Sequence, residues 1–142
     1  MISPILLVED SADDVELFRH VLEESGVRNG IVTLPDAETV RRYFSGQPPF
    51  SDRQQHPFPR VLVLDLKLPG QDGFEILKWA RAQPNAKDLL IIVLSVSDDM
   101  RSIRRAYELG ANSFLAKPLK VADVENLIQR FPQYWTRSTS EA

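Results

Sequence analysis

The chain has 142 residues, of which 43% are hydrophobic and 26% are charged, and its formal net charge is -3. This length suits one domain with an ordinary hydrophobic core, and the slightly negative charge offers no broad basic surface for nucleic acid. The sequence has no cysteine, which excludes disulfides and thiolate metal sites. No apolar run approaches the roughly 20 residues of a membrane span, and the N-terminus lacks a signal-peptide pattern. We therefore expect a cytoplasmic protein with no membrane insertion and no direct nucleic-acid binding.

Five apolar runs, each bounded by turn-forming or polar residues, predict five buried strands, at residues 5–8, 31–34, 61–65, 89–94 and 113–115. Helical patterns alternate with them, at about residues 11–26, 36–46, 73–82, 98–110 and 121–131. A long polar, proline-rich loop spans residues 47–59. This alternation predicts an α/β fold: a doubly wound, five-stranded parallel sheet in the flavodoxin-like order 2-1-3-4-5, with five helices.

Four of the predicted strands end on polar or charged residues. Glu9 and Asp10 follow the first strand, Asp65 ends the third, Ser95 follows the fourth, and Lys117 follows the fifth. The carboxyl ends of parallel strands lie at one edge of the sheet, where ligands bind in open α/β folds. We therefore expect these side chains to form one site. Each residue alone is more simply explained as a helix cap, a turn residue or a surface charge, so the prediction depends on their coincidence at strand ends.

Carboxylates brought together at such an edge repel one another. At about 4 Å, one like-charge pair costs roughly 4 kcal/mol at an effective dielectric of about 20. A divalent cation removes this cost, and a site of carboxylates and water suits Mg²⁺. A carboxylate beside a cation, a lysine and a hydroxyl can attack phosphorus, while its neighbours stabilise charge on the phosphoryl oxygens. The pattern predicts an aspartyl phosphate at Asp65, assisted by Lys117 and Ser95.

Four motifs resemble those of bacterial response-regulator receiver domains, the family that includes the chemotaxis regulators. They are VED at 8–10, LDLKLPGQDG at 64–73, LS at 94–95 and GANSFLAKP at 110–118. The third-strand motif, the proline-rich loop before it and the Tyr134-Trp135 pair also resemble stand-alone regulators associated with phytochrome-type histidine kinases. The similarity covers residues 4 to about 131. We therefore assign residues 1–131 to a receiver domain and 132–142 to a C-terminal tail that we expect to be partly disordered.

The resemblance implies a role for each matching residue. Asp65 would be the phosphoacceptor, and Ser95 and Lys117 would bind the phosphoryl group. Ser95 and Phe114 would form the switch that couples phosphorylation to the face of the fourth helix, fifth strand and fifth helix. Lys117-Pro118 would be a cis peptide. The implied ligands of Mg²⁺ are Glu9, Asp10, Asp65 and the backbone carbonyl of Lys67.

The implied function is a single-domain response regulator of a two-component or phosphorelay system. Its phosphodonor would be a sensor histidine kinase, of the phytochrome type, or a histidine phosphotransfer protein. Its output would be a contact with a downstream protein, or a homodimer formed through the last helix and the Tyr134-Trp135 tail. We expect no enzyme activity beyond self-phosphorylation and self-dephosphorylation.

Two alternatives remain open at this point. One is a constitutive interaction module that keeps the fold but is never phosphorylated. The other is a metal-dependent phosphatase that works through an aspartyl phosphate. Such hydrolases carry a second acid two residues after the nucleophile, where this chain has Lys67.

Overall fold

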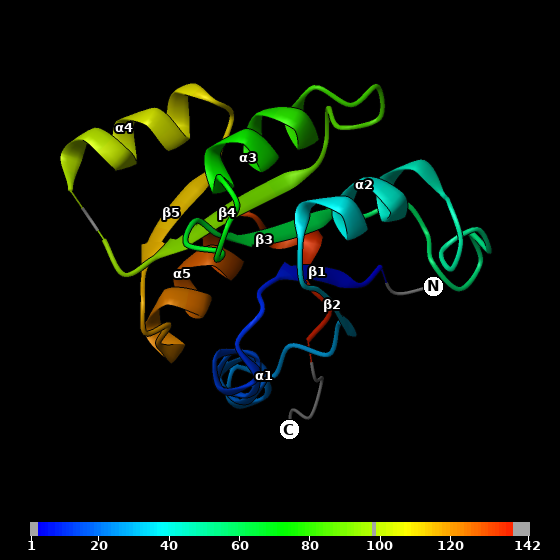
Figure 1. Cartoon of the computed structure of the whole chain (residues 1–142). Helices are drawn as coiled ribbons and strands as arrows, with labels where there is room; N and C mark the ends of the chain where they lie inside the picture. The colour runs from blue at the N-terminus through cyan, green and yellow to red at the C-terminus, as the bar shows by residue number, and fades with distance from the viewer. Residues whose placement is uncertain (1–2, 98, 138–142) are drawn as a thin grey trace.

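Five parallel strands and five α-helices alternate along the chain (Figure 1). This computed structural model describes residues 3–97 and 99–137. The strands are β1 (Ile5–Val8), β2 (Ile31–Leu34), β3 (Val61–Asp65), β4 (Leu90–Ser95) and β5 (Ser113–Ala116). The helices are α1 (Ala12–Glu24), α2 (Ala37–Ser45), α3 (Gly73–Arg81), α4 (Met100–Glu108) and α5 (Val121–Arg130). The sheet order is β2-β1-β3-β4-β5, with every neighbouring pair parallel, so the predicted doubly wound fold is confirmed.

The sheet separates two hydrophobic cores. In β1, Leu6 and Val8 join the core under α2, α3 and α4, whereas Ile5 and Leu7 join the core under α1 and α5. Strand β3 alternates in the same way, because successive side chains of a strand point to opposite faces of the sheet. Strands buried on both faces explain why the runs in the sequence are apolar throughout rather than alternating.

Side-chain caps fix the starts of the first four helices. The backbone N–H of Asp14 donates to Ser11 Oγ at 3.3 Å, which starts α1 immediately after the acidic pair that ends β1. Aspartate side chains cap the next three helices, at Asp36, Asp72 and Asp99. The Lys120 side chain has no hydrogen-bond acceptor, so it cannot cap the backbone N–H groups at the start of α5. There the carboxylate of Asp123 accepts a hydrogen bond from the Lys120 backbone N–H at 3.0 Å.

The long loop between α2 and β3 folds back onto α2. The Arg53 guanidinium donates to the carbonyl oxygens of Tyr43 at 2.8 Å and Phe44 at 2.7 Å, which lie in the last turn of α2. Carbonyls in the last turn of a helix lack their usual intrahelical N–H partners, although the Tyr43 carbonyl also accepts a hydrogen bond from the N–H of the C-cap residue Gly46 at 3.2 Å. The rings of Phe50 and His56 pack against Tyr43. The loop is thus anchored at the C-terminal end of α2.

The segment after α5 lies against the edge where the strands begin. Pro132–Tyr134 form a short 3-10 helix, and Trp135 packs into the core under α1 and α5. The buried Asn29 side chain donates to the carbonyl of Tyr134 at 3.2 Å and accepts from the N–H of Thr136 at 2.8 Å. We expected residues 132–142 to form a partly disordered tail. Residues 138–142 of this tail lie outside the described residues.

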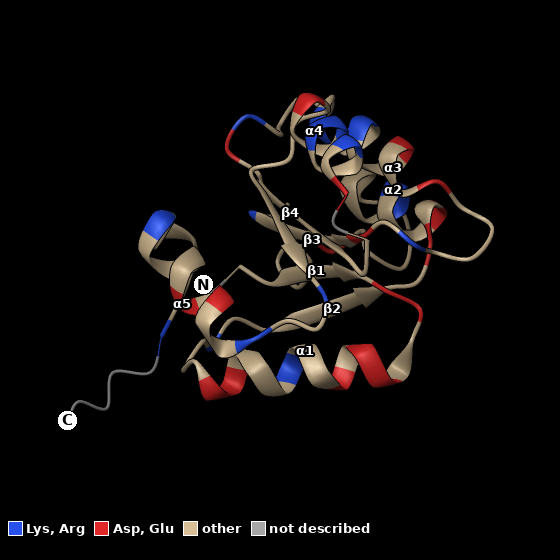
Figure 2. Ribbon diagram, turned by 90° about the vertical axis from the view of Figure 1, so that its left-hand side faces the viewer, with Lys and Arg blue, Asp and Glu red and all other residues tan. Residues whose placement is uncertain are grey.

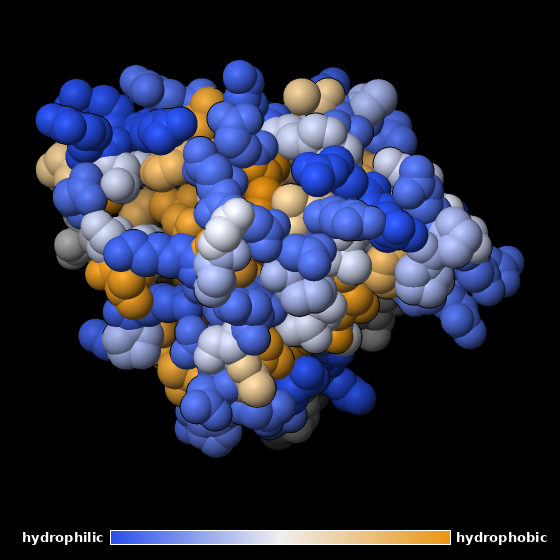
Figure 3. Space-filling model, viewed as in Figure 1, coloured by the Kyte–Doolittle hydropathy of each residue, from blue (hydrophilic) through white to orange (hydrophobic). Residues whose placement is uncertain are grey.

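The outer surface is mostly hydrophilic in the view of Figure 3, with apolar residues visible between the helices. Charge is unevenly distributed: Figure 2 shows Asp and Glu along α1 and a group of Lys and Arg on α4. Within residues 3–97 and 99–137, no helix is both long and apolar enough to cross a membrane.

Gly73, at the start of α3, is required by close packing of the backbone. A Cβ atom placed there would lie 2.6 Å from Leu66 Cα and 2.7 Å from the Leu66 carbonyl oxygen. We expect Gly73→Ala to lower the free energy of unfolding by about 1–3 kcal/mol, because backbone atoms must shift. The matched control is Gly30→Ala, since nothing lies within 4 Å of a Cβ at Gly30. Urea unfolding measures both, and equal stabilities for the two variants would contradict this packing argument.

Candidate functional site

The carboxyl edge of the sheet carries a compact site of buried polar and charged side chains. Glu9 directly follows β1, Asp65 is the last residue of β3 and Ser95 is the last residue of β4. All three side chains belong to buried residues. Lys117 follows β5 by one position, and its ammonium reaches back to β1 and β3. The structure therefore brings Glu9, Asp65, Ser95 and Lys117 to the edge at which the strand ends predicted them.

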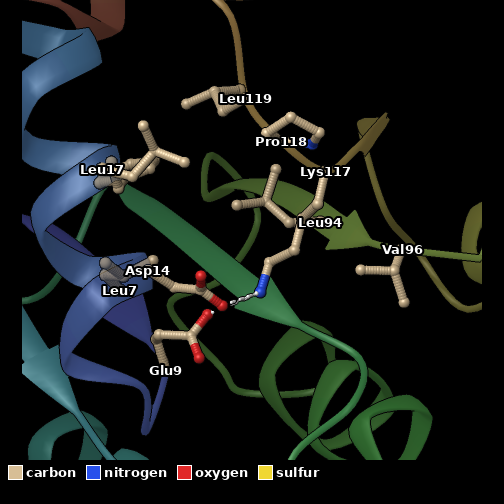
Figure 4. A pocket seen from close by; sticks show the side chains of 10 residues that line it. Leu7, Glu9, Asp14, Leu17, Leu94, Val96, Lys117, Pro118 and Leu119 are labelled. Carbon is tan, nitrogen blue, oxygen red and sulfur yellow. Dashed lines mark hydrogen bonds and ion pairs between the residues drawn. The ribbon is translucent and has the colours of Figure 1, made fainter.

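The Lys117 ammonium is the centre of this site. Its Nζ donates to Glu9 Oε1 at 3.0 Å, Asp14 Oδ2 at 2.8 Å and Asp65 Oδ2 at 2.6 Å. Asp14 comes from the first turn of α1, which is held in place by the Ser11 cap. Figure 4 shows the side chains of Glu9 and Asp14 pointing toward Lys117. One cation thus joins three carboxylates from three different elements.

Burial and ion pairing shift the protonation of this cluster. Burial raises the pKa of Glu9 above its ordinary value, and the hydrogen bond from Lys117 only partly opposes this effect. Burial lowers the pKa of Lys117, but hydrogen bonds to Asp14, Asp65 and Glu9 outweigh it, so the pKa lies above its ordinary value. Lys117 therefore stays charged at neutral pH, and it is the neutralising partner of the buried acids.

The same carboxylates fit a divalent cation. Among the described residues, Glu9, Asp14 and Asp65 each offer an oxygen, and these oxygens lie within 4.8 Å of one another. Clustered carboxylate oxygens are the ligands that hard divalent cations prefer. The predicted ligand Asp10 lies exposed on the surface and is not part of this group. The Lys67 backbone lies close, because its N–H donates to Asp65 Oδ1 at 2.9 Å.

Asp14 was not predicted as a site residue. The sequence placed it in the first turn of a helix, where a carboxylate interacts favourably with the helix dipole. The available signal was its position, one helical turn beyond the acidic end of the first strand. That signal was weak, since the neighbouring Asp13 has the same local properties and is exposed.

The two predicted switch residues lie on neighbouring strands. Ser95 is buried at the end of β4, and its Oγ accepts a hydrogen bond from the Ser97 N–H at 3.1 Å. Phe114 in β5 is partly buried against the core under α2, α3 and α4. Its backbone N–H donates to the hydroxyl of Tyr107 on α4 at 3.2 Å. The Lys117-Pro118 peptide is cis, as the resemblance implied.

A cavity of about 260 Å³ opens beside the cluster, between α1 and the segment that follows β5. Figure 4 shows Leu17 of α1 on one side of the cavity, Pro118 and Leu119 on another, and the Lys117 side chain reaching toward Glu9 and Asp14 at the acidic end. The wall is apolar except for Glu9, Asp14 and Lys117. The charged groups can thus be reached from solvent across an apolar rim.

Comparison with known proteins decides the family. Residues 5–129 match the model of the response regulator receiver domain. The chain belongs to the response-regulator receiver family. It is therefore a phosphoacceptor signalling domain, which favours the signalling function over the phosphatase alternative.

The chain is similar to other response regulators, two of which are described as phytochrome response regulators. Response regulator Rcp1 of Synechocystis sp. is 29% identical, over 96% of this chain and 90% of its own length. The Mn²⁺-bound structure of Rcp1 matches with a TM-score of 0.72 at 30% identity, covering 93% of each chain. The bacteriophytochrome response regulator RtBRR matches with a TM-score of 0.83 at 30% identity, over 100% of this chain and 85% of its own. The structure of the phosphorylated cyanobacterial phytochrome response regulator RcpA matches with a TM-score of 0.75 at 27% identity, over 95% and 94%.

Removal of the Lys117 charge should destabilise the protein most at neutral pH. Without it, the ionised acids have no cation, and we expect Lys117→Met to lose about 3 kcal/mol of unfolding free energy near pH 7. Because burial raises the folded pKa of Glu9, this acid becomes protonated as the pH falls, and the loss then shrinks. In the wild type, the contribution of Lys117 persists below its unfolded pKa of about 10.4 and disappears only as the pH rises through its raised folded pKa.

Chemical unfolding at several pH values, with and without a divalent cation, measures this effect. The cation should stabilise Lys117→Met more than the wild type, because it replaces the missing positive charge. Lys87→Met serves as the control, since Lys87 is exposed. A loss that is independent of pH, or equal to that of the control, would contradict the assigned role of Lys117.

Proposed function

We propose that Asp65 accepts a phosphoryl group from a phosphohistidine of a partner protein. The observation that carries this proposal is the Asp65 carboxylate itself: it is buried at the end of β3, with one oxygen 2.6 Å from the Lys117 ammonium. A buried carboxylate can act as a nucleophile, and the adjacent lysine can stabilise negative charge on the phosphoryl oxygens of the product. Rcp1 and RcpA, which share the fold, are described as a response regulator and as a phosphorylated one.

The reaction moves one phosphoryl group between two nucleophiles. An Asp65 oxygen forms the new bond to phosphorus as the bond to the histidine nitrogen breaks, and the imidazole leaves with its electron pair. We propose that Lys117 and the Ser95 hydroxyl donate hydrogen bonds to the phosphoryl oxygens. Mg²⁺, the cation we propose for the acidic site, would supply positive charge next to those oxygens, held by Glu9, Asp65 and the Lys67 carbonyl, with Asp10 as the remaining sequence-based candidate.

Ser95 and Phe114 are the proposed switch. Ser95 would turn toward the phosphoryl group and give up its hydrogen bond from Ser97, and Phe114 would move with it. A shift of the Phe114 backbone would be transmitted to α4, because its N–H donates to the Tyr107 hydroxyl. The affected face includes the exposed Met100 and Tyr107 of α4, so we propose that a downstream protein reads this face.

The proposed phosphodonor is a sensor histidine kinase of the phytochrome type, or a histidine phosphotransfer protein. The similarity to RtBRR and RcpA, both described as phytochrome response regulators, supports this choice. We also propose that the protein phosphorylates and dephosphorylates itself and that it is cytoplasmic. We place the boundary of the receiver domain at residue 131.

Beryllofluoride, which stands in for the phosphoryl group on an aspartate, tests the acceptor. Titration with and without Mg²⁺, followed by Trp fluorescence or backbone NMR, should show a Mg²⁺-dependent transition in the wild type and none in Asp65→Asn. The matched control is Asp72→Asn in the same loop, because asparagine also caps helices well. No transition in the wild type would reject phosphoacceptor function at Asp65 and favour a constitutive interaction module.

A homodimer through α5 and the tail is also proposed. Tyr134 and Trp135 already pack on their own chain, where the Tyr134 hydroxyl donates to the Asp88 carbonyl at 2.7 Å. We therefore expect the outward side of α5 to make the contact. Light scattering at high protein concentration, with and without Mg²⁺ and beryllofluoride, should show twice the monomer mass in at least one state, and a monomer in both would reject the dimer.

A further inference from the structure

In the unphosphorylated state, all three N–H donors of Lys117 already make hydrogen bonds. A lysine ammonium has three N–H donors and no acceptor. The three are directed at Glu9, Asp14 and Asp65, at 3.0, 2.8 and 2.6 Å. The proposed reaction requires Lys117 to donate to a phosphoryl oxygen as well. One of the present partners must therefore give up its hydrogen bond when Asp65 is phosphorylated.

The free-energy cost of breaking the hydrogen bond to Lys117 differs among its three carboxylate partners. The Glu9 side chain is only 3% exposed, and that of Asp65 is 5% exposed. A buried carboxylate that loses its cation is left charged in a poorly solvated place, which is strongly unfavourable. The Asp14 side chain is 42% exposed, so water can solvate it at once. Asp14 is thus the partner that Lys117 can leave most easily.

Asp14 also contributes a charge that the phosphorylated state does not favour. It lines the cavity, and its Oδ2 lies 2.8 Å from Lys117 Nζ, the atom that must also donate to a phosphoryl oxygen. A phosphoryl group adds negative charge to a cluster that already holds three carboxylates and one lysine. The negative charges of the Asp14 carboxylate and of the phosphoryl group would repel each other even in a partly solvated site.

We propose that Asp14 is a positioning residue that holds the third N–H of Lys117 in the resting state and yields it to a phosphoryl oxygen. In the resting state it keeps the ammonium extended toward the cluster. In the phosphorylated state it competes with the phosphoryl group for Lys117 and repels it. Asp14 therefore limits both the affinity of the site for phosphoryl groups and the lifetime of the aspartyl phosphate. This inference rests on the proposed function of Asp65.

Beryllofluoride affinity at saturating Mg²⁺ tests the inference in Asp14→Asn. Removal of the competing charge should strengthen beryllofluoride binding by roughly 3- to 10-fold and lengthen the phosphate lifetime in the same direction. The matched control is Asp13→Asn, which removes the same charge from the same turn of α1 but belongs to an exposed residue outside the cluster. A general effect of charge or of helix stability would appear equally in both variants.

The outcomes separate the possible roles of Asp14. Tighter beryllofluoride binding in Asp14→Asn than in Asp13→Asn, with similar thermal midpoints, supports the proposal. Weaker binding at saturating Mg²⁺ would overturn it and identify Asp14 as a required ligand of the cation or of the phosphoryl group. Equal binding in the two variants would overturn it as well. If the wild type itself bound no beryllofluoride, the proposed function of Asp65 would fail, whereas a normal wild type with an unaltered Asp14→Asn rejects only this inference.

Discussion

The ion cluster around the Lys117 ammonium is the constraint on which the site depends. Three carboxylates from β1, α1 and β3 would repel one another at these distances, and Lys117 is the cation that lets them share one edge of the sheet. Two of the acids are buried, so their charge cannot be relieved by water. The cluster of carboxylates is therefore stable as long as a cation is present, and one cation can replace another in neutralising it.

The sheet supplies the rigidity that this cluster requires. β1 and β3 are adjacent and in register, with Val8 opposite Leu64, so Glu9 and Asp65 emerge from neighbouring strands one position later. Behind them, apolar side chains on the two faces of the sheet form the two hydrophobic cores. Asp65 is fixed further by the turn that follows it, through the hydrogen bond from the Lys67 N–H. Packing thus restricts the site to small movements of Lys117, Ser95 and the loops.

The sequence predicted the fold and most of this site because both follow local rules. Continuous apolar runs identify buried strands, and parallel strands bring their carboxyl ends together whatever their order in the chain. Glu9, Asp65, Ser95 and Lys117 were predicted on that basis. The participation of Asp14 depends on the rotation of α1 about its axis and its angle to the sheet. Neither quantity is encoded in the spacing of apolar residues, so Asp13 and Asp14 could not be distinguished. The packing of the C-terminal segment was missed for a related reason, since Asn29 and Thr136 are far apart in the sequence.

The contacts of Asn29 have a consequence for how this domain can be combined with others. Its side-chain amide donates to the carbonyls of both Ser3 and Tyr134, so the first and last parts of the described chain meet at one residue. That meeting point lies at the edge where the strands begin, opposite the edge that carries Asp65. Circular permutation and insertion into a host loop are tolerated best where a chain enters and leaves a domain at neighbouring points. A partner polypeptide fused near Ser3 and Tyr134 would therefore lie away from the edge that carries Glu9, Asp65 and Lys117.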